Sequence, residues 1–390
     1  NFFNEVDLNT PWDYHYENLD SRTILDRLAA VKYFVVKAGE EEYLPYGYDT
    51  LAAEAEKNDR LYRAYECKNA LPIGYTYDSY IPEEKYAKMS TVEKQQALLQ
   101  GVVLADSTVP ETTPEFNDRE VSYKLVTGSG CKEKDGKLII TKENAQAKLV
   151  FDGLDECETY LITEGVDYEA LSPRELISDK KWNKMTLYEQ KKVQYENSKW
   201  RYWKESQKAY IDVTGQFLDK TISIFTDKYN AYSGRSDFLC NTGYSKKGKK
   251  SITLTFENTG VYSYKNMKVV CQPMKNIESQ TSRLGTESLK DVEIKNHELT
   301  GRISVSKDKV LVISLPYSKG FQAYVDGQKT ELKQANTMYM ALELTKGEHE
   351  IRITYCTPYL KTGLVLTCVG ILCYICVVLV CKKRRGNKKT

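Results

Sequence analysis

The chain has 390 residues, enough for about two or three domains with a sizeable core. Its formal net charge is only +2 at pH 7, so bulk charge does not indicate a nucleic-acid partner. Tyrosine is abundant, with 30 tyrosines against 10 phenylalanines and 4 tryptophans. Tyrosine suits half-buried strands and also sugar stacking, and we favour strands.

Residues 1–112 predict a small mixed α/β domain. An apolar helical stripe follows Asp20 or Ser21, either of which suits the N-cap position, and a strand then runs up to Gly39. Further strands are expected over 60–69 and 71–81.

A second helix is expected from Ser90, which forms a capping box with Glu93. The polar segment 106–116 contains two prolines and predicts a domain boundary.

Acidic and aromatic residues alternate near the start of the chain. Carboxylates accept hydrogen bonds from hydroxyl groups, aromatic faces stack on sugars, and a guanidinium can fork onto a phosphate. These residues are the substrate-binding candidates Trp12, Asp13, Tyr14, Tyr16, Asp20 and Arg22. The alternative is a helix N-terminus whose acidic residues favour the helix dipole.

Residues 113–357 predict a β-sandwich, because short apolar strands alternate with segments rich in Gly, Asn and Asp. A polar helical insertion interrupts it at about 172–208, with capping boxes at Ser172 and Thr186. Its aromatic side chains either pack the insertion onto the sandwich, which we favour, or stack on sugar or lipid headgroups. They are Trp182, Trp200, Tyr202 and Trp203.

Two hairpins are expected before the C-terminus. Asp326-Gly327 is typical of a two-residue turn, and a second turn is expected at Lys346-Gly347. Tyr317 and Lys319 precede the first hairpin and are further substrate-binding candidates. The alternative is that these residues only mark the end of the preceding strand and have no ligand role.

The segment 361–381 predicts a transmembrane helix. Residues 363–381 carry no charge, and 19 residues at about 1.5 Å each span roughly 28 Å, close to the thickness of a bilayer core. The basic tail 382–390 follows at once and predicts a cytoplasmic end, which places the bulk of the chain outside the cytoplasm. Four cysteines lie in this helix and six are scattered elsewhere, compatible with one or two disulfides or with free thiols.

The chain shows few signals for catalysis. Its three histidines are far apart in sequence, so we expect no metal site and no cofactor. It has no nucleophile elbow, phosphate-binding loop or dinucleotide fingerprint, and no residue is assigned a catalytic role.

Several stretches, in order, resemble the YfhO family of bacterial membrane proteins. The closest are "SLPYSKGFQAYVDGQKTEL" and "MALELTKGEHEIRITYCTPYLKTG", directly before the final membrane helix. "LDSRTILDRLAAVKYFVVKAG", "NALPIGYTYDSY" and "STVEKQQALLQGVV" match further upstream. Phe321 departs from the tryptophan that is frequent there, a conservative aromatic change.

The resemblance implies a polytopic protein similar to C-type glycosyltransferases. Such enzymes transfer sugar from a polyprenyl-phosphate donor to a cell-envelope polymer such as lipoteichoic acid. Their catalytic carboxylates lie on loops between early membrane helices. This chain is expected to lack that core and to supply an acceptor-binding or structural portion. The basic run 244–250 would suit a polyanionic acceptor, although a solvated loop is its default interpretation.

Membrane lipids are therefore expected partners. A non-enzymatic envelope module that binds glycan or a partner protein is the alternative function. A secreted hydrolase anchored at its C-terminus would require paired carboxylates in a cleft.

Overall fold

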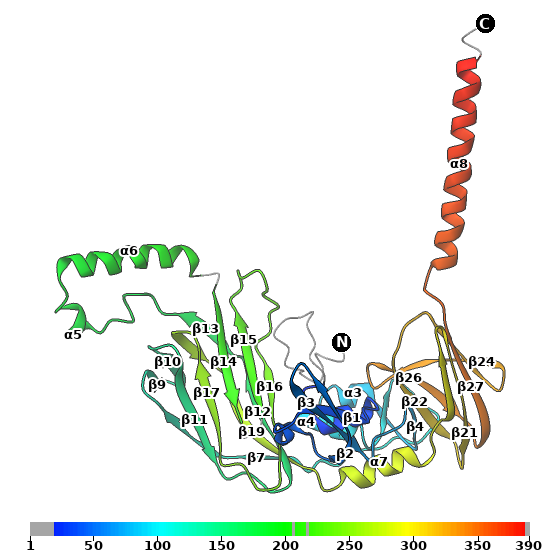
Figure 1. The fold of residues 1–390 in the computed structure, drawn as a ribbon, viewed down its shortest axis with the longest axis horizontal. Helices are drawn as coiled ribbons and strands as arrows, with labels where there is room; N and C mark the ends of the chain where they lie inside the picture. Colours follow the sequence, from blue (N-terminus) through cyan, green and yellow to red (C-terminus); the bar gives the residue numbers. More distant parts are fainter. Residues whose placement is uncertain (1–18, 205–206, 216–217, 387–390) are drawn as a thin grey trace.

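The computed structural model describes residues 19–204, 207–215 and 218–386. The chain is mostly β, as the sequence predicts, with antiparallel sheets and one long apolar C-terminal helix. Two strand-rich bodies flank a central part that contains the short N-terminal helices, and the C-terminal helix projects away from them (Figure 1).

The central part begins with the predicted mixture of helices and strands. A three-stranded sheet has the order β1-β3-β2, and two short strands, β5 and β6, pair in parallel. The strands are β1 (Tyr33–Lys37), β2 (Tyr48–Lys57), β3 (Arg60–Cys67), β5 (Tyr80–Pro82) and β6 (Val102–Leu104). The helices are α2 (Thr23–Leu28), η1 (Glu41–Tyr43), α3 (Glu83–Tyr86) and α4 (Thr91–Ala97).

The predicted cap of α4 is confirmed, and that of α2 is wrong. Ser90 and Glu93 form the reciprocal capping box. Helix α2 instead starts after Arg22, with no side-chain cap, because Asp20 and Ser21 adopt positive φ angles of 61° and 52°. A side-chain N-cap needs an extended backbone, which this left-handed turn does not provide.

Three sheets build the first strand-rich body. Their orders are β13-β18-β10-β9, β15-β14-β17-β11-β8 and β16-β12-β19-β7. The strands are β7 (Arg119–Val121), β8 (Tyr123–Thr127), β9 (Cys131–Lys134), β10 (Lys137–Ile140), β11 (Ala145–Phe151), β12 (Cys157–Glu164), β13 (Asp167–Ala170), β14 (Lys208–Thr214), β15 (Asp219–Phe225), β16 (Phe238–Ser245), β17 (Ser251–Phe256), β18 (Gly260–Ser263) and β19 (Asn266–Pro273).

The sheet centred on β12 is covered on both faces. Leu161 points into the core of the first body, whereas Tyr160 packs with Val92 of α4 on the other face. Successive side chains of a strand alternate between faces, so this sheet joins the first body to the central part.

Two more sheets build the second body, with the orders β20-β21-β27-β23-β24 and β25-β26-β22-β4. The strands of 119–355 thus surround two hydrophobic cores. The strands are β4 (Gly74–Tyr77), β20 (Lys290–Lys295), β21 (Glu298–Val305), β22 (Lys309–Pro316), β23 (Phe321–Val325), β24 (Gln328–Thr330), β25 (Lys333–Ala335), β26 (Tyr339–Leu344) and β27 (Gly347–Tyr355).

One of the two predicted hairpins is confirmed. Val325 pairs with Gln328 across Asp326-Gly327, both with positive φ, as a type I′ turn requires. The second hairpin is wrong, because β26 pairs with β22 whereas β27 pairs with β21 and β23. The turn at 346–347 therefore carries the chain from one sheet of the sandwich to the other.

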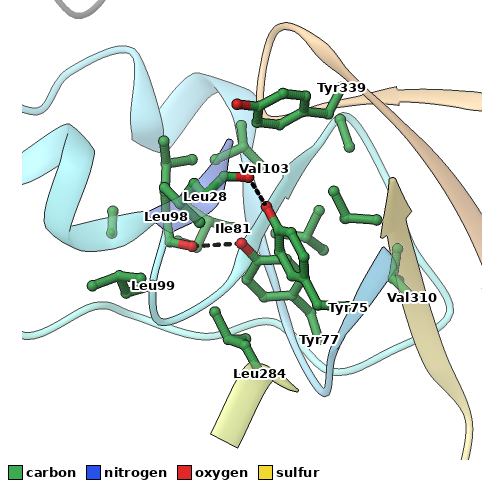
Figure 2. Packing of buried hydrophobic residues seen from close by; sticks show 14 of the residues in the cluster. Leu28, Tyr75, Tyr77, Ile81, Leu98, Leu99, Val103, Leu284, Val310 and Tyr339 are labelled. Carbon is green, nitrogen blue, oxygen red and sulfur yellow. Dashed lines mark hydrogen bonds between the residues drawn. The ribbon is translucent and has the colours of Figure 1, made fainter. Parts of the chain in front are cut away.

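A tyrosine-rich core joins the N-terminal segment to the second body. Strand β4 pairs with β22, and the cluster contains residues from 24–109 and from 274–341. Tyr75 and Tyr77 are fully buried there, and their hydroxyls donate to the carbonyls of Leu28 and Leu98 (Figure 2). The domain boundary at about 112 stays a prediction, and this core extends across it.

In the described part of the chain, four further helices lie outside the sheets. Helix α7 (Ile277–Thr286) packs beside β4, and the predicted insertion contains α5 (Asp179–Trp182) and α6 (Leu187–Trp203). Helix α8 (Leu360–Gly386) contains a candidate membrane span at Leu360–Cys381.

The favoured interpretation of the insertion, with its aromatic residues packed onto the sandwich, is wrong for Tyr202 of α6, whereas Trp200 is half-buried. This helix projects from the first body (Figure 1), and Tyr202 is 79% exposed. Trp182 packs instead against the guanidinium of Arg174, within the insertion.

Candidate functional site

The structure does not gather the predicted site residues in one place. Trp12, Asp13, Tyr14 and Tyr16 lie outside the described residues. The remaining four occupy two separate regions, and none of the four lines the main cleft between η1–β2 and the loop 246–250.

Asp20 and Arg22 are buried beside the sheet centred on β12. Asp20 forms an ion pair with Lys220, and the Arg22 guanidinium lies 3.5 Å from the Asp20 carboxylate. Asn241 donates to the backbone carbonyl of Asp20. Through these contacts Asp20 connects the start of α2 to β15 and β16. Substrate binding by Asp20 and Arg22 stays a prediction.

Tyr317 and Lys319 lie near the base of α8. Tyr317 packs against the core of the second body, and Lys319 is exposed. Between them and α8, Cys356 donates its backbone N–H to the Gly320 carbonyl, and a Cβ on Gly320 would overlap the Cys356 oxygen. This stretch fastens the segment that leads into α8, and a ligand role for its side chains stays a prediction.

A cleft of about 1390 Å³ opens between two parts of the chain. One wall is the segment from η1 to β2 with the end of β3, and the other is the loop 246–250 between β16 and β17. Its lining includes four tyrosines and five lysines: Tyr46, Tyr48, Tyr65, Tyr244, Lys68, Lys246, Lys247, Lys249 and Lys250.

The basic loop is held by its backbone. Gly248 donates to the carboxylate of Asp155 at 2.7 Å, and the Lys249 carbonyl accepts from Gly153 at 2.9 Å. A Cβ on Gly248 would overlap the Gly153 carbonyl oxygen, so only glycine permits this close approach. The loop is therefore an ordered platform that leaves the side chains of Lys246 and Lys247 exposed.

Lys249 points inward from the same loop. Its ammonium donates to the carbonyls of Thr242 and Gly243, at 2.9 Å for the latter, and to the Thr242 hydroxyl at 3.2 Å. Burial lowers its pKa to about 7, against the opposing effect of the Glu158 carboxylate. Lys249 thus supports the loop from beneath.

Arginines neutralise two of the acidic residues in the cleft. Arg63 bonds to Glu41 at 2.7 Å and lowers the pKa of that carboxyl. Arg27 bonds to Glu278 at 2.6 Å; burial acts in the opposite direction, yet this bond lowers the pKa of Glu278. The exposed lysines therefore face a lining whose acidic charge is partly cancelled.

Two tyrosines form an aromatic corner in the cleft. The rings of Tyr46 and Tyr244 meet edge to face, 5.0 Å apart, and the Arg27 guanidinium lies over Tyr46. Tyr244 also donates to Glu156. Aromatic faces beside cations suit a polymer ligand that carries both sugar and phosphate groups.

The carboxyls of Asp26 and Glu158 are buried and do not line the cleft. Burial raises the pKa values of Asp26 and Glu158. Glu158 accepts hydrogen bonds from Thr23 and Tyr160. Across the described residues no group of three His, Cys, Asp or Glu side chains could hold a metal ion, and all ten cysteines are free.

Comparison with known proteins identifies the family. The family model described as bacterial membrane protein YfhO matches residues 1–367. The chain belongs to the YfhO family of bacterial membrane proteins. Its resemblance to this family is thereby confirmed, and α8 is the C-terminal candidate membrane span of a bacterial membrane protein.

A relative and a solved structure are also similar to this chain. The uncharacterized protein YfhO of Bacillus subtilis (strain 168) is 20% identical over 390 residues, 98% of this chain and 39% of the relative. The chain therefore spans about two fifths of that protein. A cryo-EM structure of the arabinofuranosyltransferase AftD from Mycobacteria matches 41% of this chain and 13% of AftD, with 12% identity and a TM-score of 0.15.

Sequence reasoning found one half of the cleft. The basic run 244–250 was a candidate for polyanion binding, and it lines one wall. The other wall was missed, because Tyr46 and Lys68 are separated from this run by more than 170 residues in the sequence. The hint available was the segment 45–48, in which Pro and Gly alternate with two tyrosines.

Proposed function

We propose that this chain is the extracytoplasmic and C-terminal anchor portion of a polytopic glycosyltransferase-like protein. Its cleft would bind the acceptor, an anionic cell-envelope polymer such as lipoteichoic acid. The polyprenyl-phosphate sugar donor would be used by parts of the protein beyond this chain. The basic tail 382–390, directly after the candidate membrane span, supports the orientation, because clustered Lys and Arg mark the cytoplasmic side of a membrane helix.

The proposal rests on the basic loop 246–250, which is held by backbone hydrogen bonds and lies across the cleft from Tyr46 and Tyr48. Lys246 and Lys247 are exposed on a backbone that Gly248 and Asp155 hold in place. A preorganised site loses less conformational entropy on binding than a mobile loop does. Phosphates of a polymer could contact the ammonium groups while its sugar or polyol units lie against Tyr46 and Tyr244.

Binding of poly(glycerol phosphate) to the full chain in detergent tests the proposal. The variant Lys246→Gln/Lys247→Gln removes two charges from the cleft and should weaken binding about tenfold or more. Lys132→Gln/Lys134→Gln removes the same charge from β9, whose residues do not line the cleft, and should leave binding nearly unchanged. Equal weakening by both variants would contradict a specific site.

The alternative is a membrane-anchored module that binds glycan without taking part in catalysis. Sugar transfer by the full-length protein separates the two functions. The acceptor proposal expects the cleft variant to raise KM for the polymer and to change kcat little. Unchanged kinetics together with lost polymer binding would favour the non-enzymatic module.

A further inference from the structure

Helix α6 carries tyrosines and lysines along one exposed face. Tyr188, Tyr195 and Tyr202 are seven residues apart, and their exposed fractions are 79%, 60% and 79%. At about 100° per residue, the three lysines of the helix fall within the same arc of about 100°. They are Lys191, Lys192 and Lys199, all exposed.

The opposite face of α6 is already occupied. Gln190, Val193, Asn197 and Trp200 are half-buried. Asn197 accepts from the backbone of Arg174 at 3.3 Å, and Gln190 donates to the Trp182 carbonyl at 3.0 Å. The preceding segment of the insertion therefore sets the rotation of α6 and turns the Tyr/Lys face outward.

The chemistry of this face matches a headgroup layer. The two acidic residues of α6 are Glu189 and Glu196, and on the helical wheel both lie outside the Tyr/Lys arc. Glu196 lies 3.5 Å from Lys199, whose ammonium also rests 4.3 Å from the Tyr195 ring. Tyrosine is enriched at the level of lipid headgroups, and lysine is attracted to anionic lipids.

The position of the helix points to the same partner. Helix α6 and α8 extend on the same side of the molecule, and α6 runs crosswise to α8 at about the level where α8 begins (Figure 1). With α8 crossing the bilayer, α6 lies parallel to the bilayer surface and beside it. Its polar sequence suits the headgroup layer and not the hydrocarbon core.

We propose that the Tyr/Lys face of α6 binds the phosphate headgroups of the membrane that α8 crosses. The chain would then contact the bilayer at two points, the anchor α8 and the distant helix α6. Two contacts hold the body between them at a fixed orientation, as one flexible tether would not, and linked contacts strengthen one another through effective concentration.

Amide hydrogen exchange of the full chain in vesicles tests this proposal. The amides of 187–203 should exchange at least about tenfold more slowly in vesicles of phosphatidylcholine with phosphatidylglycerol than in phosphatidylcholine alone. Each lysine near an anionic surface contributes about 1 kcal/mol, or about fivefold. Raising the salt concentration should remove most of the difference.

Variants separate the face from general charge. Lys191→Gln/Lys192→Gln/Lys199→Gln should abolish the difference between the two lipid mixtures, with helicity unchanged. The matched variant Lys132→Gln/Lys134→Gln/Lys137→Gln, on exposed positions of the β9–β10 hairpin, should retain it. Equal exchange of the wild-type chain in both mixtures would overturn the proposal. So would slower exchange that needs added poly(glycerol phosphate) in place of anionic lipid.

Discussion

The tyrosine-rich core and helix α6 use tyrosine in opposite ways. Tyr75 and Tyr77 are buried, and each hydroxyl donates to a backbone carbonyl from a neighbouring element. Tyr188 and Tyr202 expose most of their surface on a projecting helix. The contrast shows that tyrosine can stabilise a core through a buried ring whose hydroxyl bonds to the backbone, or can present its ring at the surface.

The largest expected effect contrasts the two regions directly. Replacing Tyr75 with Ala leaves a cavity in a packed core and should reduce the free energy of unfolding by about 4 kcal/mol. Replacing Tyr195, on α6, with Ala should change it by less than about 0.5 kcal/mol. Urea unfolding of the detergent-solubilised chain measures both. Similar losses would show that α6 is packed as tightly as the core.

The second prediction concerns a buried lysine. Because burial lowers the pKa of Lys249 to about 7, the unfolded chain binds more protons than the folded chain between pH 7 and about pH 10.4. Stability should therefore rise with pH in this window, by about 3 kcal/mol from pH 7 to 9.5 relative to Lys249→Met. The exposed Lys250→Met is the control. A pH-independent difference between wild type and Lys249→Met would contradict the prediction.

The third prediction isolates one hydroxyl in the tyrosine-rich core. Tyr77→Phe keeps the ring but leaves the Leu98 carbonyl without this donor, at 2.6 Å in the wild type. The expected loss is about 1.5 kcal/mol in the free energy of unfolding. Tyr188→Phe on α6, where the side chain is exposed, should have almost no effect in the same measurement. A neutral Tyr77→Phe would mean that the ring alone stabilises the core.

The smallest effect is expected at the confirmed hairpin. Asp326 accepts from the Glu350 N–H and from His349, both at 2.8 Å. The hydrogen bonds from the Glu350 N–H and from His349 lower the pKa of Asp326. Partial burial acts to lower the pKa of His349, but the bond to Asp326 outweighs burial, and the pKa of His349 is raised.

The Asp326–His349 contribution is therefore lost as pH falls through the Asp326 pKa and as pH rises through the His349 pKa. Asp326→Asn should reduce stability by less than about 1 kcal/mol near pH 5.5, because Asp326 is half exposed. The deficit should shrink by pH 8. A deficit that grows toward pH 8 would rule out the pair as its origin.

Local sequence signals predicted local structure. The capping box at Ser90 and the turn at Asp326-Gly327 formed as expected, because each depends on residues within one turn. The Lys346-Gly347 turn was predicted as a hairpin, but a Lys-Gly turn can equally connect strands of two different sheets, as β26 and β27 are here. Pairing of β4 with β22 could not be predicted, since it joins segments more than 230 residues apart in the sequence.

For the candidate site as well, the sequence shows the local features but not those that depend on distant segments. The basic run 244–250 is visible in the sequence, but its fixed backbone depends on Gly153 and Asp155, from another loop. Asp20 and Arg22 were chosen for their side-chain chemistry, and burial beside Lys220 could not be inferred from neighbouring residues. Burial is a property of the whole fold, which single motifs do not report.

The most direct test of the account measures two readouts on two variants of the full chain in anionic vesicles. If the cleft and α6 are separate binding surfaces, Lys246→Gln/Lys247→Gln should lose poly(glycerol phosphate) binding but keep slow amide exchange over 187–203. Lys191→Gln/Lys192→Gln/Lys199→Gln should lose slow exchange and keep polymer binding. If either variant loses both properties while remaining folded, the cleft and α6 are not separate binding surfaces, and the account is contradicted.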